Sequence, residues 1–225
     1  IEAREKFGPV HAGLRALGFT HVEGPRAELL SLYTGPRERP HSLHVRQQFL
    51  KVAPHLLKAL ARAADPEATL TRFAQIVSNL RAPSVIYDTL LMNPELSGHL
   101  VALVENSEFL SNLLIRDPGL FETFGRASAL EHASSREELN EQLDGLLRAY
   151  ERDAAPYRLH TGETLRIGMR DIILGVDVMS IGRELTLLAE VCLDYAIAKA
   201  REKVAVRFGE TKTGFAVLAL GKFAG

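Results

Sequence analysis

The chain has 225 residues, 46% hydrophobic and 24% charged, which is enough apolar material for one large core or two small ones. The formal charge is −1, from 27 basic and 28 acidic residues, so bulk charge excludes recognition of nucleic acid or of an anionic membrane. The single cysteine excludes an internal disulfide and a thiolate zinc cluster.

No apolar run reaches the roughly 18 residues that a membrane span needs. The first residues show neither a signal-peptide pattern nor an initiator methionine. We therefore expect a cytoplasmic protein without a membrane segment, and a chain that is a piece of a longer protein.

Apolar residues recur with a helical period over about 210 residues, which predicts an all-α fold. The first helix has one apolar face, formed by Val10, Leu14 and Leu17. Gly18 can end this helix, because glycine adopts the left-handed conformation without a Cβ clash. A second short helix is predicted over residues 25–33. The proline- and glycine-rich stretch 35–40 is the best linker candidate.

Three later helices are predicted to start in the same way, at Asp65-Pro66, Asn93-Pro94 and Asp117-Pro118. Each pair offers a capping side chain before a proline whose missing N–H costs nothing at the first helical position. Ser84 and Ser107 can cap two further helices. The three starts marked by proline lie about 24–28 residues apart, which favours a multi-helix bundle or stacked helical hairpins.

Ser135 and Glu138 form a capping-box pattern that opens another helix, with apolar residues on one face. Two more helices are predicted over residues 161–174 and 180–208. The period then changes. Residues 214–220 form a short apolar run between glycines, typical of a strand buried on both faces. We expect the rest of its sheet to come after residue 225.

The glycine turn after this run, Gly221–Gly225, suits backbone contact with a phosphate. It is not a P-loop, because Ala216 and Phe223 occupy positions where that motif needs a glycine and a hydroxyl residue. Two interpretations remain open on the residues alone: an ordinary structural turn and the start of a nucleotide site.

Several runs of the sequence resemble the bacterial glutamine synthetase adenylyltransferase/deadenylylase family. The C-terminal runs look like the approach to a transferase domain of that family: Leu165–Gly175, Arg183–Leu185 and Gly214–Gly225. Upstream runs resemble the helical region that joins its two transferase domains: Asp65–Ala68, Ser107–Leu110 and Leu114–Pro118. The resemblance covers most of the chain from about Leu43 and is strongest after Leu165.

The resemblance implies that Gly221, Lys222 and Gly225 begin a nucleotide site. Phe223-Ala224 stand where the family more often has leucine and glycine. The resemblance also implies that metal-binding aspartates come on the next strand, so this chain holds neither catalytic nor metal-binding residues. Metal neutralises the developing charge in such transfers, and we expect the fragment alone to be inactive.

For the parent protein, the resemblance implies an enzyme that moves AMP onto and off a tyrosine of glutamine synthetase and so controls nitrogen assimilation. It also implies ATP and Mg²⁺ as cofactors, and glutamine synthetase and a PII-type signal protein as partners. Two alternatives stay open: a non-catalytic helical interaction module, and a related nucleotidyltransferase with another substrate.

The predicted organisation has four parts. Residues 1–40 are the helical end of a preceding domain or a linker, and residues 41–160 are a helical linker domain. Residues 161–213 are long helices leading into the transferase domain. Residues 214–225 are the first strand and glycine turn of a truncated nucleotidyltransferase domain.

Three other kinds of residue are candidates for chemistry. His41 and His44 could share a helix face, but no third zinc ligand is near them in the sequence. Cys192 falls in an apolar stripe, where a cysteine is usually a small buried hydrophobe. Four charged residues could form ion pairs between helices, but the sequence favours a solvated face for them: Arg170, Asp171, Arg183 and Glu184.

Overall fold

The structure is a computed structural model that describes residues 2–80, 82–121, 130–150, 153–209, 214 and 216–218. Every regular element within these ranges is a helix, which confirms the all-α prediction for them. The helices are α1 (Glu2–Ala16), α2 (Glu23–Thr34), α3 (Leu43–Leu60), α4 (Pro66–Asn79), α5 (Pro83–Met92), α6 (Leu96–Asn106), α7 (Glu108–Arg116), η1 (Pro118–Leu120), α9 (Arg136–Ala149), α10 (Ala155–Leu174) and α11 (Val178–Phe208). None of the helices in these ranges combines the length and the hydropathy that a membrane crossing requires.

The chain divides into two compact units. Unit 1 comprises Ile1–Ala127 with Ile172–Leu174, and unit 2 comprises Ser128–Asp171 with Gly175–Gly225. The four-part organisation expected from the sequence concerns the parent protein and stays a prediction.

Several helix ends lie where the sequence predicted them. The Asp65 carboxylate accepts a hydrogen bond from a first-turn amide of α4 at 2.9 Å, and the Ser107 hydroxyl accepts one in α7 at 3.1 Å. Gly18 follows α1 with φ 92°, and Gly175 follows α10 with φ 60°. This left-handed conformation is open to glycine because it has no Cβ, which explains why the helices end there.

Several predicted starts are wrong, most of them by one or two residues, and α10 begins at Ala155 rather than at residue 161. α6 begins at Leu96, because Pro94 and Glu95 form a turn in which the Leu96 amide donates to the carbonyl oxygen of Asn93. Ser84 does not cap α5, since the helix already begins at Pro83, whose fixed φ suits the first helical position. The Asp117-Pro118 pair begins η1, a 3₁₀ helix, rather than an α-helix within the described ranges.

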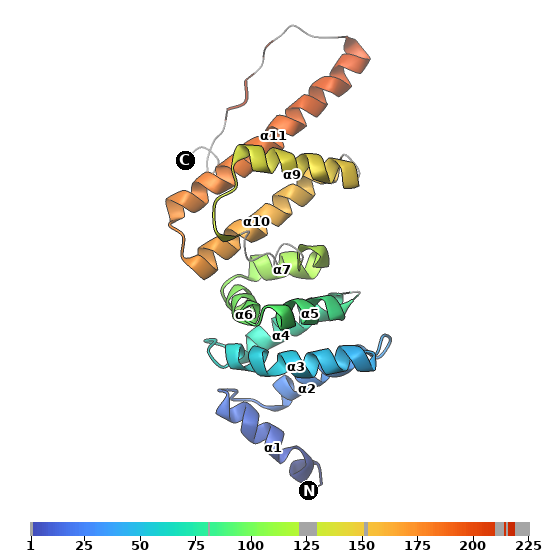
Figure 1. The fold of residues 1–225 in the computed structure, drawn as a ribbon, viewed down its shortest axis with the longest axis vertical. Coiled ribbons are helices and arrows are strands. Elements are labelled where there is room, and N and C mark those ends of the chain that lie inside the picture. The colour runs from blue at the N-terminus through green and yellow to red at the C-terminus, as the bar shows by residue number, and fades with distance from the viewer. Residues whose placement is uncertain are drawn as a thin grey trace. The chain divides into compact units, whose positions relative to one another are not determined.

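Unit 1 is a stack of helices, as one of the two predicted arrangements requires (Figure 1). Helices two or three places apart in the sequence pack together: α2 with α4, α3 with α5 and α6, and α4 with α6 and α7. Their facing sides supply the core, which includes Phe49, Leu56, Leu70, Phe73, Ile76, Ile86, Leu100 and Leu114. The packing follows the order of the chain, so each helix from α4 onward packs mainly on helices two or three places before it.

Two polar contacts fix the first helices of unit 1. Fully buried Tyr87 of α5 donates its hydroxyl hydrogen to the carbonyl oxygen of Leu32 in α2 at 2.9 Å. Glu67 of α4 accepts hydrogen bonds from the Thr20 amide at 2.9 Å, the Thr20 hydroxyl at 2.7 Å and the His21 amide at 2.8 Å. Glu67 therefore ties the connection between α1 and α2 to the start of α4.

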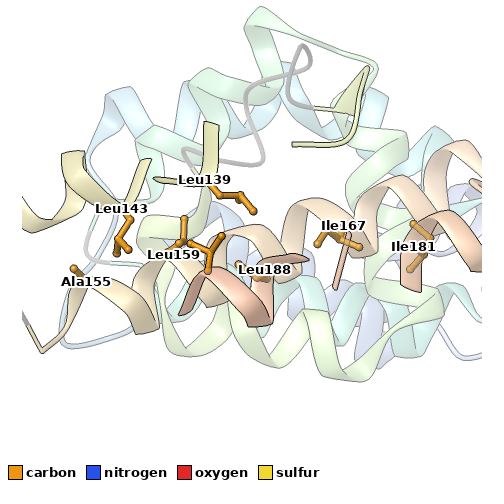
Figure 2. Packing of buried hydrophobic residues seen from close by; sticks show 8 residues of the cluster. Leu139, Leu143, Ala155, Leu159, Ile167, Ile181 and Leu188 are labelled. Atoms are coloured by element: carbon orange, nitrogen blue, oxygen red, sulfur yellow. The ribbon is translucent and has the colours of Figure 1, made fainter. Parts of the chain in front are cut away.

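Unit 2 is built from α9, α10 and α11 (Figure 2). The predicted capping box opens α9: Ser135 and Glu138 exchange hydrogen bonds between side chain and backbone. The three helices share one hydrophobic cluster, formed by Leu139, Leu143, Ala155, Leu159, Ile167, Ile181, Leu188 and Val191. Apolar residues of all three helices thus leave water together, which drives their association.

The predicted strand at residues 214–220 is not shown. Of that run the structure describes Gly214 and residues 216–218, which belong to no regular element and are exposed, Leu218 to 84%. A buried strand needs partner strands to accept its backbone hydrogen bonds, and the described part of the chain contains none.

Candidate functional site

The residues predicted to begin a nucleotide site, Gly221, Lys222 and Gly225, lie outside the described residues, so their role stays a prediction. α11 is the last described helix before them and ends at Phe208, which is followed by Gly209 with φ 80°. The described residues nearest to the predicted turn in the sequence are therefore those of unit 2, and its polar interior is the candidate site.

The other candidates from the sequence are not brought together. His41 is half-buried in unit 1 and His44 is exposed. No group of three His, Cys, Asp or Glu side chains that could hold a metal ion occurs in the part of the chain that the structure describes. Cys192 packs beside the hydrophobic cluster of unit 2, and burial raises the pKa of its thiol. Its interpretation as a small hydrophobe fits this environment.

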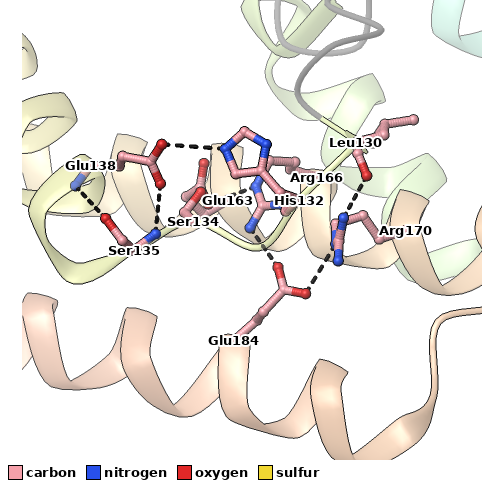
Figure 3. Close-up of polar contacts among 9 residues, drawn as sticks. All are labelled: Leu130, His132, Ser134, Ser135, Glu138, Glu163, Arg166, Arg170 and Glu184. Carbon is pink, nitrogen blue, oxygen red and sulfur yellow. Dashed lines mark hydrogen bonds and ion pairs between the residues drawn. The ribbon is translucent and has the colours of Figure 1, made fainter.

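Four buried charged side chains form a network inside unit 2 (Figure 3). Glu163, Arg166 and Arg170 lie three and four residues apart on α10, a spacing that puts them on one helix face. Arg166 contacts Glu163 at 2.8 Å, and Glu184 of α11 at 2.7 Å. Arg170 contacts the second carboxylate oxygen of Glu184 at 3.0 Å. We call these four residues the buried ion network.

The buried ion network also holds the chain segment that precedes α9. Arg166 donates to the carbonyl oxygen of His132 at 3.2 Å, and Arg170 donates to that of Leu130. The Ser134 hydroxyl donates to Glu163 at 3.1 Å. Residues 130–134 thus make their hydrogen bonds with α10 side chains, and the chain enters the α9 capping box from a fixed position.

The charges of the buried ion network balance, with two carboxylates and two guanidinium groups, each less than 10% exposed. An isolated charge at this depth would cost several kcal/mol, so each needs a partner. Arg166 uses Nε, Nη1 and Nη2 on three different acceptors. The arrangement can hold three chain segments in register. Since its charged groups are committed to one another, it is a positioning device rather than a centre for acid–base chemistry.

The predicted solvated face is wrong for two of its four residues. Arg170 and Glu184 are buried and paired with each other, whereas Asp171 and Arg183 are exposed as expected. Glu163 and Arg166, the other network members, are not among the residues that the sequence pointed to. The sequence did contain a signal for their burial. Glu163 and Arg166 share a face of α10 with Arg170, and core residues such as Ile167 lie next to that face.

Comparison with known proteins places this region in a family. The family model described as glutamate-ammonia ligase adenylyltransferase matches residues 97–225, from the start of α6 through the C-terminal glycine turn. The match therefore includes the whole of unit 2 and extends back into unit 1.

A curated relative agrees with this match. The bifunctional glutamine synthetase adenylyltransferase/adenylyl-removing enzyme of Thioalkalivibrio sulfidiphilus (strain HL-EbGR7) is 25% identical over 256 aligned residues, which cover 100% of this chain and 26% of the relative. The chain thus spans about a quarter of the relative's length. Because the family model matches more than half of its residues, the chain belongs to the glutamate-ammonia ligase adenylyltransferase family.

Proposed function

We propose that the chain is a helical linker or regulatory segment of a cytoplasmic enzyme that moves AMP onto and off a tyrosine of glutamine synthetase, controlling nitrogen assimilation. The observation that carries the proposal is the family match over residues 97–225. The name of the bifunctional relative supports both directions of transfer.

Within the parent enzyme, unit 2 has a mechanical role in this proposal. The buried ion network clamps α10, α11 and residues 130–134 together. A clamped helix pair gives the segment after α11 a fixed origin, and catalytic groups must be held within a fraction of an ångström of their productive geometry. In this role unit 2 supports the transferase domain as a rigid base.

The parent enzyme uses ATP and Mg²⁺, and a PII-type signal protein regulates it. In this proposal Gly221, Lys222 and Gly225 approach the phosphates, and carboxylates beyond them in the parent chain hold the metal, which neutralises charge on the transferred group. The 225 residues alone carry no carboxylate after the glycine turn, so they transfer no AMP.

The test compares two chains in one assay. The 225-residue chain and a longer chain with a complete transferase domain are each incubated with ATP, Mg²⁺ and glutamine synthetase, and AMP bound to the synthetase is measured. We expect transfer by the longer chain only. Two aspartates separated by one residue should lie within about fifteen positions after Gly225, so that the next strand carries them beside the glycine turn.

Either of two results would contradict the proposal. A parent gene without the acidic pair would favour a non-catalytic interaction module. Transfer by the 225-residue chain itself would place an active site among the helices. Mixing the chain with glutamine synthetase and with the signal protein, and measuring association, would show which partner this segment contacts.

A further inference from the structure

A cavity of about 340 Å³ lies in unit 1, between the loop that joins α2 to α3 and the start of α5. Its volume is at the small end of the range for ligand pockets, roughly 300–1,000 Å³. The loop contributes Pro36, Arg39, Pro40 and His41 to the wall, and the start of α5 contributes Pro83 and Ser84. The wall therefore combines rigid apolar rings with polar groups.

Hydrogen bonds and close packing within the loop between α2 and α3 fix its backbone. The Arg39 amide donates to the carbonyl oxygen of Pro36 at 3.0 Å, and the His41 amide donates to that of Thr34 at 2.7 Å. Gly35 has φ +77°, and a Cβ on it would lie 2.4 Å from Cδ2 of His41. Because only glycine lets the imidazole pack this closely, the loop holds the His41 ring and the backbone of Arg39 in place before any ligand arrives, while the Arg39 side chain is exposed.

The polar groups of the cavity favour an anion. Arg39 is the one charged side chain among the described residues of its wall. The helix α5 begins there without a side-chain cap, and because Pro83 has no N–H and the Val85 amide donates to Ala82, the Ser84 amide is the first-turn donor on the wall. Both features attract oxyanions, which accept several hydrogen bonds at once.

A buried nitrogen on the same wall lacks a hydrogen bond. Nδ1 of His41 is buried and has no partner in the described part of the chain, although buried polar atoms are normally paired. Burial lowers the pKa of His41, hydrogen bonds with the Tyr33 and Leu32 backbone oppose this, and the Arg46 charge adds to the lowering. An anion beside the ring would offset the nearby positive charge and could complete its hydrogen bonding.

We propose that this cavity binds a small organic anion, whose carboxylate or phosphate oxygens are held by Arg39 and the start of α5. The organic part lies against the proline rings, and the ligand supplies the hydrogen bond that Nδ1 of His41 lacks. The wall lies before residue 97, where the family match begins, so the site is independent of the proposed function.

The test titrates the 225-residue chain with inorganic phosphate and, separately, with succinate at constant ionic strength. Imidazole resonances of His41 are followed by NMR, assigned by their loss in His41→Gln. We expect saturable shifts with at least one anion, and the anion that saturates identifies the ligand as a phosphate or a carboxylate. Arg39→Gln should weaken binding about tenfold or more, as expected when a charged hydrogen bond is lost.

Arg37→Gln is the matched control, because Arg37 is exposed in the same loop and is not among the residues that line the cavity. It removes the same charge and should leave the affinity unchanged. Shifts that stay linear with both anions would overturn the proposal. So would unchanged binding by Arg39→Gln, or an equal loss in the two variants, which would indicate general charge attraction. The dispersion of the NMR signals shows whether each variant is folded.

Discussion

Replacing Glu184 by alanine removes the one carboxylate that joins α10 to α11 through both arginines. Arg166 keeps Glu163 and a backbone carbonyl, but among the described residues Arg170 keeps only the carbonyl oxygen of Leu130. Glu184→Ala therefore leaves a buried cation without a counter-ion, a change that costs about 3–5 kcal/mol. For a unit of this size, the loss corresponds to a fall of about 15 °C or more in the melting temperature.

Thermal unfolding followed by circular dichroism measures the fall, and hydrogen exchange of α10 and α11 amides assigns it to unit 2. Glu190→Ala is the control on the same helix, since Glu190 is 44% exposed and pairs with Arg136. An exposed pair contributes about 0–1 kcal/mol. The reasoning fails if Glu184→Ala lowers stability by less than about 1 kcal/mol, or if Glu190→Ala lowers it as much.

Three other variants test separate contacts. Hydrogen bonds from the His21 amide and Thr20 lower the pKa of Glu67 from 4.5 to about 2, so its stabilisation is complete above pH 4.5 and disappears as the pH falls toward 2. In Glu67→Gln the melting temperature of unit 1 should depend less on pH across that interval. Ser135→Ala should cost about 0.5–2 kcal/mol in urea unfolding, because α9 loses its cap. Tyr87→Phe should cost about 0.5–1.5 kcal/mol by the same measurement, since it removes the hydrogen bond from the Tyr87 hydroxyl to the carbonyl oxygen of Leu32.

Local chemistry made much of the helical fold predictable. Asp65, Ser107 and Ser135 cap their helices through amides three positions away, so the signal lies within one turn of sequence. The Asn93-Pro94 start was wrong for a related reason: the pair is compatible with both a cap and a turn, and here two turn residues precede α6. Which helices pack together depends on contacts far apart in the sequence, which local patterns do not contain.

The candidate site was less predictable. Spacing alone shows that Glu163, Arg166 and Arg170 share one face of α10. Their burial depends on where Glu184 lies, and that position follows from the turn at Gly175 and from how α11 packs on α10. A solvated face is the usual outcome for such charges, and here the tertiary contact overrode it. The nucleotide turn was predicted from the family resemblance. Testing whether it binds ATP needs a chain that includes the transferase domain.

Three residues of the buried ion network also belong to the runs that resemble the family, so the network gives a physical reason for part of the resemblance. Arg166 and Arg170 lie within Leu165–Gly175, and Glu184 lies within Arg183–Leu185. A lysine could not replace Arg166 here, because one ammonium cannot reach three acceptors in the planar fork that a guanidinium provides. The contacts that lock α10 and α11 together are therefore enough to account for the arginines at these positions. In the proposed function, this run of the sequence is a rigid support, and the chemistry belongs to the glycine turn and to the transferase domain that it begins.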